Sequence, residues 1–171
     1  MYDRWSLDVL YSGFEDPKFQ SEFKQLDEFV EKFKNTAESL GSKDERTTTK
    51  EALTLIEDYH RIFNRLVNYC ALRQNADTND GESVSNLGRL IQKNNDITPF
   101  ATAIDKYLST LSDLDDVIGD DEMLQDYSFY LHEMQKSAKY LLSEEVETAL
   151  GAMDMSGGNA WSDLQGYLTS L

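Results

Sequence analysis

The sequence predicts an all-α fold, an irregular up-down bundle of about five to six helices. Two prolines and nine glycines among 171 residues leave room for long helices and are poor material for a turn-rich β-sandwich. Apolar residues recur at spacings of three and four along most of the chain, as on the buried stripe of an amphipathic helix. No segment alternates apolar and polar residues convincingly enough for a strand.

The length favours one helical domain over residues 1–171. Within it we expect an N-terminal arm at 1–15, a main bundle at 16–155 and a junction helix at 156–171. The first helix has the clearest signals, because Asp16 suits the N-cap, Pro17 the first helical position and Gly41 the stop. Its apolar stripe consists of Phe19, Phe23, Leu26, Val30, Phe33, Ala37 and Leu40.

The second predicted helix runs from about Thr48 to Asn75 and carries two apolar stripes. One consists of Leu53, Ile56, His60, Phe63, Val67 and Cys70, and the other of Leu55, Tyr59, Ile62, Leu66 and Tyr69. So wide an apolar arc predicts a central helix with neighbours on two sides and places Phe63 in the core. A polar break with turn residues follows at 76–82.

The third predicted segment reaches from Val84 to Leu114 and contains Ile91 and Pro99. The proline either kinks one long helix near Asn95 or splits it in two. Residues 113–122 are acidic and contain a glycine, which predicts a loop or a broken turn.

Three more helices are expected after this acidic stretch. The fourth has an apolar face of Met123, Tyr127, Leu131, Met134, Ala138 and Leu141. The fifth begins at Ser143, with two glutamates in its first turn that favour the helix dipole, and ends near Met155. The sixth begins at Asn159 and repeats Trp161, Leu164, Leu168 and Leu171.

The charge argues against two classes of partner. With 32 acidic and 16 basic residues, the formal net charge is -16, which repels nucleic acid and anionic lipid, and we find no local basic patch. The single cysteine, Cys70, fits a reducing compartment and is expected to be an inert core thiol. Without a signal-peptide pattern or an apolar run of membrane-spanning length, we expect a cytoplasmic protein with no membrane partner.

The best match to a zinc peptidase motif is incomplete. Such chemistry needs two histidines one helical turn apart with a glutamate between them. His132-Glu133 is followed by Lys136 where the second ligand should be, and an ammonium group cannot bind zinc at neutral pH. His132 is therefore predicted to be a surface histidine of its helix, beside a core methionine.

Other motifs fail for similar reasons. Glu57 and His60 have the spacing of a di-iron ligand pair, but a second such pair is absent, so His60 is expected in or near the interior with a Tyr or acidic partner. Residues 76–81 place Ala76 where a calcium loop needs its first carboxylate, which favours a turn between helices. We expect no catalytic, cofactor-binding or metal-binding residue in this chain.

Several segments, in this order, resemble the oligoendopeptidase F family of zinc metallopeptidases. They are WSLDVLYSGF at 5–14, ADTND at 76–80, YSFYL at 127–131, LSEEVE at 142–147 and SGGNAW at 156–161. No single motif is specific, but their order and spacing together are fairly specific. The resemblance implies the N-terminal helical region of a metalloendopeptidase, which forms part of one wall of a deep cleft where oligopeptides are cleaved.

The resemblance also implies what lies elsewhere. In the family, zinc is bound by two histidines of a His-Glu-x-x-His motif and a later glutamate, all in a downstream catalytic domain that this chain lacks. None of these ligands maps onto a residue here, so zinc is expected only in that domain. The expected partners are this catalytic domain, an oligopeptide substrate and, through an exposed junction surface, a second copy of the chain.

The apolar stripe of the sixth helix runs to Leu171, which predicts a helix that lies at a domain junction. The alternative to a peptidase domain is a free-standing helical protein-interaction module without enzymatic activity. Whether the reading frame continues past Leu171 into a His-Glu-x-x-His motif distinguishes the two hypotheses.

Overall fold

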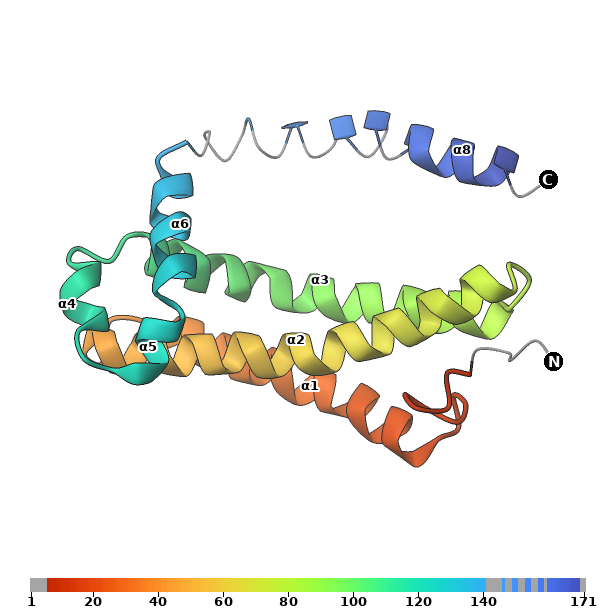
Figure 1. The fold of residues 1–171 in the computed structure, drawn as a ribbon, viewed down its shortest axis with the longest axis horizontal. Coiled ribbons are helices and arrows are strands. Elements are labelled where there is room, and N and C mark those ends of the chain that lie inside the picture. The colour runs from red at the N-terminus through yellow and green to blue at the C-terminus, as the bar shows by residue number, and fades with distance from the viewer. Residues whose placement is uncertain are drawn as a thin grey trace. The chain divides into compact units, whose positions relative to one another are not determined.

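The computed structural model describes residues 6–140, 146, 149–150, 153–154, 157–158 and 160–169. These residues form seven helices and no strand (Figure 1), so the predicted all-α fold is confirmed. The helices are α1 (Pro17–Glu38), α2 (Glu45–Ala76), α3 (Gly81–Ser109), α4 (Leu114–Ile118), α5 (Glu122–Asp126), α6 (Ser128–Ala138) and α8 (Ala160–Thr169). Among the described residues, none of these helices is long and apolar enough to cross a bilayer.

The chain divides into two compact units, residues 1–134 and 135–171, and each is described by itself. In the first unit, α1, α2 and α3 pack pairwise against one another (Figure 1), so α2 has neighbours on two sides, as its wide apolar arc predicts. The boundaries expected between the arm and the main bundle, at residues 15 and 16, and between the bundle and the junction helix, at residues 155 and 156, stay predictions.

The core of the first unit is rich in aromatic rings. Its most deeply buried side chains are Tyr11, Phe19, Phe33, Leu26, Leu53, Leu66, Leu90, Ile97, Ile104, Leu108, Leu124 and Leu131. Tyr11 packs edge-on against Phe19 and Tyr69, with ring centroids 5.2 and 5.1 Å apart. Edge-to-face pairs of this kind add stabilisation beyond the area they bury. The arm before α1 therefore contributes to the core.

The signals for α1 are confirmed at both ends. The Asp16 carboxylate accepts a hydrogen bond of 2.8 Å from the backbone N–H of Lys18, and Pro17 is the first helical residue. Gly41 has φ 75°, which a residue with a side chain adopts only with strain. The predicted stripe omitted Phe29, which is buried, while Val30 is only partly buried.

Helix α2 begins at Glu45 rather than Thr48, because Asp44 is its N-cap and accepts from the N–H of Thr47 at 2.9 Å. Its buried side chains are Thr48, Thr49, Ala52, Leu53, Tyr59, Leu66, Tyr69 and Cys70. Phe63, predicted to lie in the core, is half-buried and stacks on Tyr59 with the ring centroids 5.1 Å apart.

Helix α3 is continuous through Pro99, so the alternative in which the proline splits it in two is wrong. The predicted buried face is also wrong in its first half. Val84 and Ile91 are exposed, whereas Leu90 is fully buried. Successive helical residues differ by about 100° in direction. Burial of Leu90 in place of Ile91 therefore means that the buried face is rotated by about 100° from the predicted one.

The short helix α4 lies within residues 113–122, where a loop or a broken turn was predicted, and the short helix α5 begins at the end of this stretch. Both α4 and α5 begin at an aspartate N-cap, Asp113 and Asp121, whose carboxylates accept the backbone N–H groups of Asp116 and Leu124. The single fourth helix predicted from Met123 is wrong, because α5 ends at Asp126, Tyr127 is its C-cap and α6 begins at Ser128.

In the second unit, the described large apolar side chains are exposed. They are Tyr140, Val146, Leu150, Met153, Trp161, Leu164 and Leu168. Helix α8 confirms a sixth predicted helix in this stretch. The predicted fifth helix begins at Ser143 and ends near Met155, and both of these residues lie outside the described part of the chain.

Candidate functional site

A groove of about 570 Å³ lies between α2 and the junction of α5 with α6. Its walls are Leu53, Ile56, Glu57, His60, Arg61, Asn64, Tyr127 and Tyr130. Asp121 fixes the first turn of α5, and the break at Tyr127 sets where α6 starts. Tyr127 and Tyr130 therefore both face α2, and the groove is an apolar hollow with a polar rim.

The rim is organised by Glu57. Its carboxylate accepts a hydrogen bond from the Tyr127 hydroxyl at 2.6 Å and another from Arg61 at 3.2 Å. The Tyr127 hydrogen bond is the main cause that lowers the pKa of Glu57, and Arg61 adds to it. Glu57 is therefore an ionised, engaged carboxylate at neutral pH, which suits it to position Tyr127 rather than to accept a proton from a substrate.

A smaller cavity of about 120 Å³ adjoins the groove, and Ile56, His60 and Tyr130 line both. At this cavity the Tyr59 hydroxyl donates to the Asn94 side-chain oxygen at 2.7 Å. Burial raises the pKa of Asp105, and the nearby His60 acts in the opposite direction. Burial also raises the pKa of Tyr130, with a smaller contribution from Asp105.

His60 was expected in the interior or at its boundary. It is exposed at the edge of the groove, with its ring 5.5 Å from that of Tyr59, so the interior alternative is wrong. The two predicted stripes of α2 left open which residue of the Tyr59–His60 pair faces the core, and Tyr59 does. Both kinds of expected neighbour, a tyrosine and an acid, are nevertheless close to His60.

His132 is an exposed histidine of α6, as predicted. Its Nδ1 lies 2.8 Å from the carbonyl oxygen of Ser128 and its Nε2 lies 3.2 Å from the Asp115 carboxylate. Across the described part of the chain, no three His, Cys, Asp or Glu side chains are grouped as metal ligands would be.

The turn between α2 and α3 explains residues 76–81 without a cation. Asp80 is the N-cap of α3, accepting from the N–H and the hydroxyl of Ser83 at 3.1 and 2.7 Å. It also pairs with Arg73 at 2.9 Å. The predicted turn is thus confirmed.

Cys70 of α2 is buried, and burial raises its pKa to about 11. The side chain therefore stays a thiol, which fits the predicted inert core cysteine.

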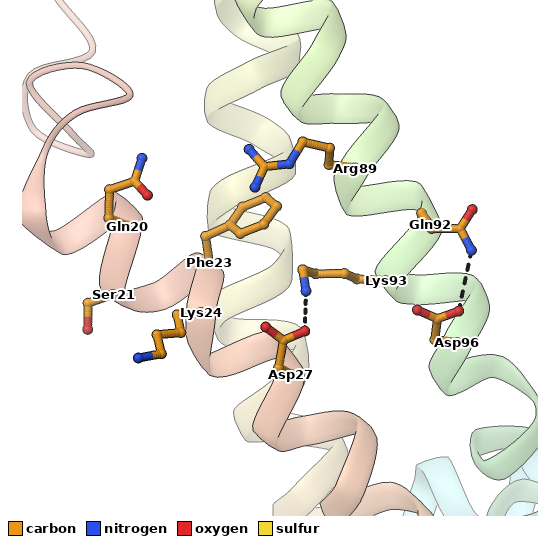
Figure 2. Close-up of a pocket in the computed structure, with 9 residues that line it drawn as sticks. All are labelled: Gln20, Ser21, Phe23, Lys24, Asp27, Arg89, Gln92, Lys93 and Asp96. Carbon is orange, nitrogen blue, oxygen red and sulfur yellow. Dashed lines mark hydrogen bonds and ion pairs between the residues drawn. The ribbon is translucent and has the colours of Figure 1, made fainter.

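A second groove, of about 830 Å³, lies between α1 and α3. Figure 2 shows Phe23 and Asp27 of α1 pointing toward α3, and Arg89 and Lys93 of α3 pointing back toward α1. Ser21 and Lys24 point away from α3. Arg89 lies over the Phe23 ring, with its guanidinium carbon 4.3 Å from the centroid, and Lys93 pairs with Asp27.

The sequence did not predict that these residues come together to form the two grooves. In the sequence, Tyr130 lies beside the apolar face predicted for the helix from Met123, and Arg89 lies between apolar positions of α3. Each groove joins residues far apart in the chain, as the Tyr127–Glu57 bond does across 70 positions. The closeness of an aromatic and two charged residues on α1, Phe23, Lys24 and Asp27, was a signal, but it does not indicate which helix crosses α1 there.

A comparison of the sequence with protein-family models finds one matching family. Residues 111–170 match the family model of the N-terminal region of oligopeptidase F. No match was found among the curated proteins or among the solved structures. The matched stretch includes α4, α5, α6 and α8, and with them Tyr127 and Tyr130 of the first groove. The resemblance to the oligoendopeptidase F family is therefore confirmed as a similarity over residues 111–170.

Proposed function

We propose that this chain is the N-terminal helical domain of a zinc metalloendopeptidase that cleaves oligopeptides, and that it forms part of the cleft wall without being catalytic itself. The observation that carries the proposal is the family match over residues 111–170. The zinc would be bound by the downstream catalytic domain, which is also the chain's main partner.

We further propose that the α2–α6 groove is the part of the wall that meets the peptide. This proposal is supported by the sequence position of two groove residues, since Tyr127 and Tyr130 lie in the stretch that matches the family. Tyrosines offer a peptide apolar area and a hydrogen-bonding hydroxyl in one rigid side chain. The ionised Glu57 and the neighbouring Arg61 supply charges of both signs on its rim.

The test compares the 171-residue chain with the same chain extended along its natural reading frame. We expect the extended protein to bind zinc and to cleave a quenched fluorescent oligopeptide until a chelator is added, and the 171-residue chain to do neither. A reading frame that ends at Leu171, or that continues without His-Glu-x-x-His, would contradict the proposal and favour the interaction module.

The wall is tested in the extended, active protein. Tyr130→Ala removes groove surface but no catalytic group, so KM should rise about 5- to 10-fold with kcat nearly unchanged. Lys34→Ala, an exposed α1 residue outside both grooves, is the matched control and should change neither constant. Equal effects of the two variants on KM would show that the groove does not meet the peptide.

A further inference from the structure

The α1–α3 groove is less acidic than the molecule around it. The protein carries a formal net charge of -16, yet the side chains that face each other across the groove include Arg89 and Lys93 and only two carboxylates, Asp27 and Asp96. Both acids are already engaged, Asp27 by Lys93 and Asp96 by the side-chain amide of Gln92. An anion that reaches this groove meets local attraction within a repelling surface.

Arg89 is held in place before any ligand arrives. Its Nη1 donates to the Asn86 side-chain oxygen at 3.0 Å, and its guanidinium carbon lies 4.3 Å from the Phe23 centroid. Asn86 is itself buried and donates to the carbonyl oxygen of Glu82 at 3.0 Å. A side chain fixed in this way loses less conformational entropy on binding than a free arginine.

Most of the donor capacity of Arg89 is unused. A guanidinium has five N–H donors, and within the described part of the chain Arg89 makes one hydrogen bond and no ion pair. The planar fork matches a carboxylate with two parallel hydrogen bonds. Lys93, whose side chain is mostly buried and lies 5.4 Å from the same ring, is paired with Asp27, and its ammonium group keeps further N–H donors beside Arg89.

We propose that Arg89 and Lys93 form a carboxylate-binding site in the α1–α3 groove, and that its ligand is a carboxylate-bearing peptide segment. A hollow of about 830 Å³ has room for several residues of such a segment. Nucleic acid carries its anions along an extended backbone, and the rest of this acidic surface repels it. The site lies on α1 and α3, outside the family-matched stretch, and does not depend on the proposed peptidase function.

The test titrates three acetylated five-residue peptides based on pentaalanine into the 171-residue protein at pH 7 and follows backbone amide shifts by NMR. One peptide has a free C-terminus, one is amidated, and one is amidated with a central aspartate. We expect both carboxylate peptides to bind in the millimolar range and to shift amides of α1 and α3 near Phe23 and Arg89, and the neutral peptide not to bind. Comparing the two carboxylate peptides identifies whether a C-terminal or a side-chain carboxylate is preferred.

Three variants sharpen the result. Arg89→Gln should weaken binding by about 10-fold or more, since hydrogen bonds to charged groups contribute about 1.5–3 kcal/mol. Lys34→Gln, which removes the same charge from α1 outside the groove, should stay within about 2-fold, because its effect is only long-range and screened. Asp27→Asn leaves Arg89 intact and frees Lys93, so it should tighten binding.

The proposal is overturned if the amidated pentaalanine binds as well as the carboxylate peptides, or if no peptide binds. It is also overturned if Arg89→Gln and Lys34→Gln have equal effects, or if inorganic phosphate binds more tightly than the peptides, which would indicate a general anion site. Loss of binding in Asp27→Asn, with the fold retained by circular dichroism, would contradict the assigned role of Lys93.

Discussion

The two compact units differ in where their apolar side chains lie. In the first unit, over its described residues 6–134, most of the large apolar side chains form one hydrophobic core. Among the described residues of 135–171 the large apolar side chains are exposed, and Trp161 is 71% exposed. Helices of the first kind are stabilised by burial, whereas a helix of the second kind depends on local interactions, which are marginal below about 12–15 residues. The family match spans parts of both units.

The largest expected effect of this difference is on amide hydrogen exchange. Helix α8 has 10 residues and exposed side chains at Trp161, Leu164 and Leu168, so it should open locally at little cost. The amides of α2 around Leu66, which is fully buried, should exchange only when the first unit unfolds. We expect protection in α2 to exceed that in α8 by about 1000-fold or more, which corresponds to about 4 kcal/mol.

Equal protection of α8 and α2 in a monomeric sample would break the comparison, because it would require α8 to be buried. Repeating the exchange over a wide range of protein concentration is the control. Protection of α8 that appears only at high concentration would indicate association through its apolar face.

Truncation of a core ring should give the next largest effect. Phe33 of α1 is 1% exposed and packs edge-on against Tyr59 at 5.4 Å, so Phe33→Ala should destabilise the first unit by about 3–5 kcal/mol. Phe129 of α6 is 80% exposed, and Phe129→Ala should change the free energy of unfolding by less than about 0.5 kcal/mol. Urea denaturation measures both.

Phe63 provides an intermediate case between the buried Phe33 and the exposed Phe129. As a core residue it would cost as much as Phe33, but it is half-buried. It keeps a stacked contact with Tyr59 at an interplanar angle of 19°. We therefore expect Phe63→Ala to cost about 2 kcal/mol, between the buried and exposed cases. A cost equal to that of Phe33→Ala would mean that the outer side of α2 is more tightly packed than its exposure indicates.

The difference between Phe63 and Phe33 illustrates what the sequence could predict. Local signals were reliable: Asp16, Pro17 and Gly41 bound α1 as expected, and the three- and four-residue spacing identified the long helices. The buried face was not reliable wherever apolar residues surround the helix, because Tyr59 rather than His60, and Leu90 rather than Ile91, faces the core. That choice depends on where the neighbouring helices cross, which is tertiary information.

The short helices α4 and α5 were not predicted, for a different reason. Residues 113–126 contain two aspartate N-caps within ten positions, and such short helices have too few residues to show a periodic stripe. The first of them, α4, is held instead by Arg46 of α2, which donates to the carbonyl oxygens of Val117 and Asp116 at 2.9 and 2.8 Å. The grooves could not be predicted either, since each joins helices whose pairing is set by this kind of distant contact.

This Arg46 contact leads to a smaller prediction at Gly119. Gly119 has φ 48°, and a Cβ there would lie 2.4 Å from an Arg46 guanidinium nitrogen. Gly119→Ala should therefore strain the backbone and displace Arg46, at a cost of about 2 kcal/mol. The matched control is Gly88→Ala in the middle of α3, where a Cβ meets no other atom within 4 Å. That variant should gain about 0.5–1 kcal/mol.

A double-mutant cycle tests the cause. If the clash with Arg46 matters, Gly119→Ala should cost less in an Arg46→Ala background than in the natural chain. An equal cost in both backgrounds would assign the whole effect to backbone strain at φ 48°.

The smallest expected effect concerns pH and the α2–α3 turn of the first unit. Hydrogen bonds from Ser83, with help from Arg73, hold the pKa of Asp80 below its ordinary value of 3.8. A carboxyl group whose pKa is lower in the folded than in the unfolded state stabilises the fold above its unfolded pKa, and this contribution is lost as pH falls through the folded value. Asp80→Asn should therefore lower stability at pH 7 and make the loss of stability below about pH 5 shallower. Asp96→Asn, also on α3 and exposed, is the control and should leave that slope unchanged. If both variants flatten the curve equally, relief of the general negative charge, rather than the Asp80 cap, governs the acid response of the bundle.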